Sequence, residues 1–190
     1  MAQRDLLVRV VDVLDGAHIP YMLTGSFASS LQGEPRSTHD IDLVLDLPES
    51  AVQILVVSFP MPRYFLDRDA LVRAVRTAGM ANLLDTQEGD KVDFWMLTPG
   101  AFDQSRFARR MTIEFAGRPV RVSRPEDTIL QKLAWSRLSG GNERQERDAR
   151  RVFEVQYESL DREYLETWAA RLGVDRELAT FGGADRKPGA

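Results

Sequence analysis

The sequence has 190 residues, of which 43% are apolar and 28% charged, a balance that predicts a globular protein with one full hydrophobic core and at most a small second part. A formal net charge of −4 argues against a protein that coats nucleic acid through general phosphate contacts. There is no cysteine, which excludes disulfides and cysteine zinc sites. There is also no long apolar run or leader pattern, so we expect a cytoplasmic protein with no membrane partner.

The first two thirds of the sequence alternate between helical and extended patterns. Apolar residues at helical spacing predict an amphipathic helix over 3–15, and an apolar run predicts a strand over 21–24. A bend then leads into a short helix over 27–31, and a second strand begins at Asp40. The same patterns further along predict helices over 48–58, 69–77 and 102–110 and strands over 64–67, 81–85, 91–97, 111–115 and 119–122.

The character of the sequence changes near Ser123, where strands give way to helices. Ser123 is followed by a proline and two acids, a helix start that predicts a helix to about Leu138. Two more helices are predicted over 143–155 and 161–172. The last residues are polar and rich in glycine, which is typical of a flexible end. We therefore expect a core over 1–123, a helical C-terminal part over 124–180 and a flexible tail over 181–190.

Two carboxylates lie on one face of the second strand. Residues two apart in a strand point to the same side, so Asp40 and Asp42 are neighbours, while Ile41 and Leu43 face the core. Adjacent carboxylates repel, and one of them would be neutral unless a cation lay between them. Because hard divalent cations prefer oxygen ligands, the pair predicts a metal site.

A third carboxylate and a glycine bend add to this pattern. Asp93 lies on the polar face of a later strand and would join Asp40 and Asp42 if the two strands were neighbours. Two Mg²⁺ ions held there would activate an attacking hydroxyl and stabilise a leaving pyrophosphate. Gly25 allows the backbone to approach a phosphate closely, and Ser26 adds a hydroxyl at the start of a helix.

The arrangement resembles the polymerase-beta-type nucleotidyltransferase superfamily, with Gly25-Ser26, a gap of thirteen residues, Asp40-x-Asp42 and the later Asp93. The segment PRSTHDIDL further resembles the AbiEii-type nucleotidyltransferase toxins and their relatives. The resemblance implies an α/β (α+β) fold, with a mixed twisted sheet, flanking helices and a helical C-terminal part. It also implies that the three aspartates bind Mg²⁺, that Asp93 alternatively acts as the base for the acceptor hydroxyl, and that Gly25 and Ser26 hold the triphosphate.

The helical half also resembles the toxin family, through RPEDTILQKLAW and ERDARRVFEV. That resemblance implies a contact of Lys132 with the triphosphate or the acceptor, and a place for Asp148 in an Arg–Asp motif. The local sequence does not decide the role of Lys132, since a lysine between Leu130 and Leu133 can equally be a solvated helix residue. Lysine is rare here, because only three of the 25 basic residues are lysines.

The predicted activity is the Mg²⁺-dependent transfer of a nucleoside monophosphate from a nucleoside triphosphate to an acceptor hydroxyl. The toxin resemblance implies an RNA, tRNA or protein acceptor and a cognate antitoxin as a partner. One alternative is a catalytically silent protein of the same fold that binds nucleotide or acts as a partner scaffold. Another is a phosphatase of the haloacid-dehalogenase type, but there the two aspartates end the strand, whereas Leu43, Val44 and Leu45 continue it here.

Overall fold

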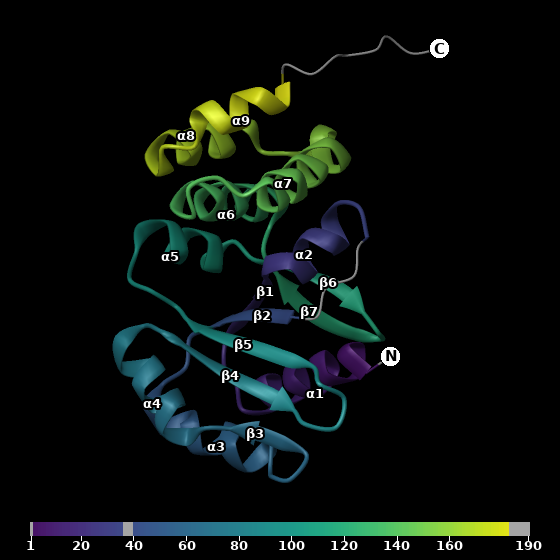
Figure 1. Ribbon diagram of the computed structural model, residues 1–190, viewed down its shortest axis with the longest axis vertical. Coiled ribbons are helices and arrows are strands. Elements are labelled where there is room, and N and C mark those ends of the chain that lie inside the picture. Colours follow the sequence, from purple (N-terminus) through teal and green to yellow (C-terminus); the bar gives the residue numbers. More distant parts are fainter. Residues whose placement is uncertain (1, 36–39, 183–190) are drawn as a thin grey trace. The chain divides into compact units, whose positions relative to one another are not determined.

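The computed structural model describes residues 2–35 and 40–182 (Figure 1). The chain divides into two compact units. Unit 1 comprises Met1–Ala28 and Ser37–Arg124, and unit 2 comprises Ser29–Arg36 and Pro125–Ala190. The longer segment of unit 2 starts at Pro125, two residues after Ser123, and its shorter segment lies early in the chain, where the sequence pattern predicts no part of a second unit.

Unit 1 contains a mixed seven-stranded sheet within the described part of the chain (Figure 1). Its strands are β1 Tyr21–Thr24, β2 Asp40–Leu45, β3 Tyr64–Leu66, β4 Met80–Asp85, β5 Lys91–Met96, β6 Met111–Phe115 and β7 Arg118–Val122. Their order is β3-β4-β5-β2-β1-β7-β6. The pairs β2–β5 and β1–β7 are parallel and the other neighbours are antiparallel. The mixed sheet expected from the sequence is confirmed.

The helices of the described residues follow the sequence pattern with one exception. They are α1 Ala2–Gly16, α2 Gly25–Gln32, α3 Val52–Ser58 after the 3₁₀ turn η1 Glu49–Ala51, α4 Arg68–Thr77, α5 Ala101–Ala108, α6 Pro125–Leu138, α7 Glu143–Gln156 before the 3₁₀ turn η2 Tyr157–Ser159, α8 Arg162–Leu172 and α9 Asp175–Gly182. No described helix is long and apolar enough to cross a membrane.

The exception is α9, which the sequence pattern did not predict. The expected flexible tail is wrong at its first two residues, because Phe181 and Gly182 belong to this helix. Phe181 is buried and its ring lies 5.6 Å from that of Phe153 on α7, in an edge-on contact. An aromatic side chain that finds such a partner keeps a short helix folded despite its glycine-rich surroundings. Residues 183–190 lie outside the described residues.

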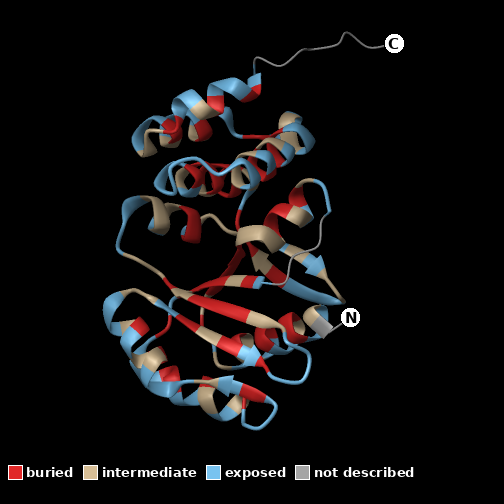
Figure 2. Cartoon of the chain, viewed as in Figure 1, coloured by how far each residue is buried: buried red, intermediate tan, exposed pale blue. Residues whose placement is uncertain are grey.

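The two faces of the sheet in unit 1 are covered differently (Figure 2). On one face, Ile41, Leu43 and Leu45 of β2 are fully buried in the main core, together with residues of α1, α3 and α4. On the opposite face, Val44 of β2 packs with Phe107 of α5 in a smaller cluster. This second face is the one that carries the aspartates, because side chains alternate along a strand.

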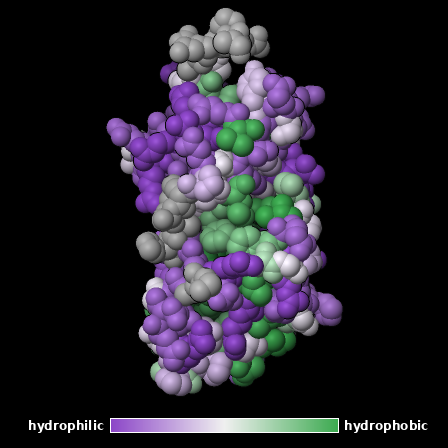
Figure 3. All heavy atoms as spheres, turned by 90° about the vertical axis from the view of Figure 1, so that its right-hand side faces the viewer, coloured by the Kyte–Doolittle hydropathy of each residue, from purple (hydrophilic) through white to green (hydrophobic). Residues whose placement is uncertain are grey.

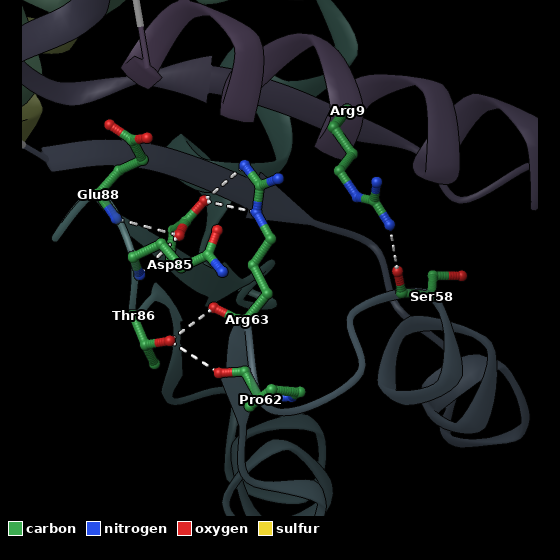
Figure 4. Close-up of polar contacts among 8 residues, drawn as sticks. Arg9, Ser58, Pro62, Arg63, Asp85, Thr86 and Glu88 are labelled. Carbon is green, nitrogen blue, oxygen red and sulfur yellow. Dashed lines mark hydrogen bonds and ion pairs between the residues drawn. The ribbon is translucent and has the colours of Figure 1, made fainter.

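One edge of the sheet is anchored by the carboxylate of Asp85 at the end of β4 (Figure 4). It accepts hydrogen bonds from the backbone N–H groups of Gln87 and Glu88, at 3.0 and 3.3 Å, and forms an ion pair of 3.2 Å with Arg63. Burial acts to raise the pKa of Asp85, but these donors outweigh it and hold the pKa below its ordinary value. The turn between β4 and β5 is therefore fixed next to the strand that carries Asp93.

The other edge of the sheet is the β6–β7 hairpin. The apolar side chains of its outer strand β6 are only partly buried, whereas Val120 and Val122 of β7 are fully buried. Figure 3 views the molecule from the side on which this hairpin lies in Figure 1, and apolar residues are visible among polar ones in the middle of that face. Phe27 of α2 packs edge-on against Phe115 of β6, with ring centroids 5.6 Å apart, and Ile113 also packs against the core. These contacts join the start of α2 to the sheet.

Candidate active site

The register of the sheet brings the two aspartate-bearing strands together. In the parallel pair β2–β5, Asp42 lies opposite Asp93 and Asp40 lies opposite Lys91. Neighbouring strands are about 4.8 Å apart, so side chains at paired positions on the same face are in reach of one another. The sequence required β2 and β5 to be neighbours for a joint site, and they are.

Asp93 is the most enclosed of the three carboxylates, with 7% of its surface exposed. Its Oδ1 accepts a hydrogen bond from the side-chain amide of Asn82, which lies opposite it on β4. Its Oδ2 forms an ion pair of 3.0 Å with Nζ of Lys91. Donors on both oxygens satisfy the buried carboxylate and fix its orientation.

Asp42 is held between a tryptophan and the glycine bend. Nε1 of Trp95 donates to Oδ1 of Asp42 at 3.3 Å. A Cβ atom placed on Gly25 would lie only 2.0 Å from Oδ2 of Asp42, so the backbone at the start of α2 passes directly against this carboxylate. Gly25 also has a φ of +66°, which side-chain-bearing residues rarely adopt. The position is therefore restricted to glycine for two separate reasons.

Lys91 is a member of the site that the sequence reasoning missed. Its Nζ lies 3.3 Å from Oδ1 of Asp40 and 3.0 Å from Oδ2 of Asp93. The hydrogen bond to Asp93 and the charges of both aspartates raise the pKa of Lys91. A signal was available in the sequence: Lys91 is one of three lysines and stands two residues before Asp93, on the same face of the same strand.

The donor chemistry of the site fits a divalent cation. Asp40, Asp42 and Asp93 provide oxygen atoms only, as Mg²⁺ prefers, and the ammonium of Lys91 between two of them shows that the patch holds positive charge. Among residues 2–35 and 40–182, no three acidic, histidine or cysteine side chains are already gathered at metal-binding spacing. The ligand roles of the three aspartates therefore stay predictions.

Comparison with known proteins identifies the family. A family model described as aminoglycoside-2''-adenylyltransferase matches residues 6–152. The chain belongs to this family. Its members are nucleotidyltransferases, so the predicted enzyme class and superfamily are confirmed. The search of curated proteins found no match.

Solved structures of several adenylyltransferases and related proteins share the fold. The structure of ANT(2'')-Ia in complex with adenylyl-2''-tobramycin has 17% identity and a TM-score of 0.59, and the match covers 91% of this chain and 98% of that one. An antigenic nucleotidyltransferase-like protein from Paracoccidioides brasiliensis has 18% identity and a TM-score of 0.58, with 95% and 92% covered. The lincomycin-bound lincosamide antibiotic adenylyltransferase LnuA has 12% identity and a TM-score of 0.54, with 78% and 95% covered.

Three more residues were predicted to take part in the function of this adenylyltransferase family member: Ser26, Lys132 and Asp148. Ser26 is half-buried in the first turn of α2, directly after Gly25. In unit 2, Lys132 on α6 and Asp148 on α7 are both buried and form an ion pair of 3.0 Å. The contacts proposed for Ser26 and Lys132 with a triphosphate stay predictions. Arg36 and Thr38 of the PRSTHDIDL segment lie outside the described residues.

The Lys132–Asp148 pair leads to a prediction about stability. Breaking a buried ion pair by removing one partner strands the other charge in a medium of low polarity. We expect Lys132→Met to lower the free energy of unfolding by about 3 kcal/mol. The double variant Lys132→Met with Asp148→Leu should recover part of this loss, because it leaves no stranded charge. Urea unfolding of both single variants and the double variant tests this, and a loss in the double variant equal to the sum of the two single losses would show that the pair is not coupled.

Proposed function

We propose that the protein transfers AMP from ATP to a hydroxyl of a small-molecule acceptor and releases pyrophosphate, in a reaction that depends on Mg²⁺. The observation that carries the proposal is the pairing of Asp42 with Asp93 on the face of the sheet opposite the main core, beside the bend at Gly25. The pairing supports the proposal because carboxylates that would hold a cation then lie next to the start of α2, and backbone N–H groups at a helix start stabilise phosphate oxygens.

Each residue of the site has a defined task in this proposal. Asp40, Asp42 and Asp93 would hold Mg²⁺, which when bound neutralises the triphosphate and favours deprotonation of the attacking hydroxyl. Gly25 and Ser26 would hold the triphosphate at the start of α2. Asn82 keeps Asp93 in place through its hydrogen bond.

The bonding changes follow from an in-line displacement at phosphorus. The acceptor oxygen bonds to the α-phosphorus, and the bond from that phosphorus to the bridging oxygen of the β-phosphate breaks. The electron pair of the broken bond leaves with pyrophosphate. The proton of the hydroxyl passes to a base, and Asp93 is the candidate if it acts as the base instead of as a metal ligand, which is the alternative that the family resemblance implies.

The acceptor class is suggested by the relatives. One similar structure contains an adenylylated tobramycin and another contains lincomycin, which are small molecules with several hydroxyl groups. We propose an acceptor of this kind in preference to the RNA or protein acceptor, and the antitoxin partner, implied by the resemblance to AbiEii-type toxins. The family match supports this choice, because it names a small-molecule adenylyltransferase.

A labelling experiment tests the proposal. The purified protein is incubated with Mg²⁺ and each α-labelled nucleoside triphosphate, together with tobramycin, lincomycin, total RNA or total cell protein. We expect label from ATP to enter a small molecule, with one pyrophosphate released for each transfer. Label found only in RNA or protein would favour the toxin-type activity. Nucleotide binding without any transfer would favour a silent scaffold, and Asp42→Asn serves as the negative control.

A further inference from the structure

We propose that Lys91 is a positioning residue that takes the place of a divalent cation between Asp40 and Asp93, and that a metal ion must displace it in order to bind. The inference rests on the proposed function in one respect, since it takes these two aspartates to be metal ligands. It adds a residue that neither the sequence motif nor the family resemblance assigns.

The geometry of Lys91 is fixed by the sheet. The residue lies directly opposite Asp40 across the β2–β5 pair and two positions before Asp93 on its own strand. All three side chains therefore leave the sheet on the same face. The ammonium lies 3.3 Å from one carboxylate and 3.0 Å from the other, so a single positive charge bridges the two strands.

The carboxylates need such a charge. Asp93 is largely buried, and two carboxylates that reach the same nitrogen atom would otherwise repel each other across the strands. Lysine suits the position, because its ammonium is a compact point charge on a flexible chain, whereas arginine presents a wide planar fork. The sequence places one of its three lysines here and uses arginine for nearly every other basic residue.

The distances indicate exchange with a metal ion. Oxygen ligands of Mg²⁺ lie at about 2.1 Å, much closer than the oxygen–nitrogen distances around Lys91. A metal ion cannot share the space with the ammonium, so the side chain must swing out before the carboxylates close around the ion.

Lys91 would have opposite effects on the stability of the metal-free protein and on its affinity for metal. Lys91 stabilises the form without metal, because it neutralises Asp40 and Asp93. It also weakens metal binding, because an ion pair must be broken for each metal ion that enters. If Lys91 had only a structural role, its removal would disturb the carboxylates and weaken metal binding. Under the present proposal, its removal strengthens metal binding.

The test compares Lys91→Met with the wild-type protein and with two controls. Lys91→Arg keeps the charge, and Arg76→Met removes one positive charge from an exposed ion pair with Glu49 elsewhere in unit 1. Binding of Mn²⁺ is measured by electron paramagnetic resonance without nucleotide, and thermal unfolding is followed in EDTA and in excess Mg²⁺.

We expect Lys91→Met to bind Mn²⁺ about tenfold more tightly than the wild type, from the loss of one competing ion-pair interaction. Its melting temperature in EDTA should fall by about 4 °C and recover in Mg²⁺. Lys91→Arg, which keeps the charge, should lose less thermal stability in EDTA than Lys91→Met, and Arg76→Met should keep wild-type Mn²⁺ affinity.

Two results would overturn the inference, and they are distinguishable. If the wild type binds Mn²⁺ and Lys91→Met binds it equally or more weakly, Lys91 is not a competitor of the metal, while the proposed function stands. If the wild type binds no Mn²⁺, the metal-dependent function and this role of Lys91 both fail. Should Lys91→Met not fold, Lys91→Gln replaces it with the same expected direction.

Discussion

Replacing Asp42 with asparagine is expected to abolish AMP transfer while the fold survives. Asp42 lies at the centre of the site, opposite Asp93 on β5 and against the backbone of Gly25. Asparagine keeps the shape of the side chain and an oxygen that can accept from Trp95, but it removes the charge that would hold a cation. We expect kcat/KM to fall by about a thousandfold or more, the scale of losing several kcal/mol of transition-state stabilisation.

A matched control is available on the same segment. Asp46 is exposed just beyond the end of β2, and Asp46→Asn makes the same change of charge away from the carboxylate patch. Its activity should stay within about twofold of the wild type, since exposed charges contribute little. Pyrophosphate release and thermal unfolding are measured for both variants. Undiminished release by Asp42→Asn would end the proposal that this carboxylate binds the reactive metal.

The alternation of apolar and polar residues predicted most of the sheet and its two faces correctly. Ile41, Leu43 and Leu45 are buried, and Asp40 and Asp42 lie on the other face, because a strand has a strict period of two. Strand pairing is a different matter. The segment between β2 and β5 contains α3, β3, α4 and β4, and no local pattern states that β5 returns to lie beside β2. The motif resemblance provided that link.

Three features of the site and fold could not be predicted from the sequence pattern. The close approach of Gly25 to Asp42 depends on a positive φ and on the β1–β2 register, which place Thr24 opposite Asp42. The role of Lys91 depends on a contact across two strands. The burial of Phe181 depends on Phe153, far away in the sequence. Each feature is a tertiary contact, and local periodicity contains no information about such contacts.

Replacing Gly25 with alanine is expected to damage both stability and activity. At a φ of +66°, an alanine costs about 1–2 kcal/mol relative to glycine. Its Cβ would also lie 2.0 Å from Oδ2 and 2.6 Å from Cγ of Asp42, so either the carboxylate or the start of α2 must move. Displacement of a reacting group by about 1 Å costs on the order of a hundredfold in rate, and we expect kcat/KM to fall by at least that factor.

A second glycine separates the two effects of this substitution. Gly89 in the turn between β4 and β5 has a φ of +77°, but a Cβ placed there would meet no atom within 4 Å. Gly89→Ala should therefore lose a similar 1–2 kcal/mol of unfolding free energy, measured in urea, and keep nearly full kcat/KM. If Gly25→Ala were as active as Gly89→Ala, the contact with Asp42 would have no part in catalysis. If it alone is inactive, the glycine bend acts by leaving room for the carboxylate, because backbone strain is common to both variants.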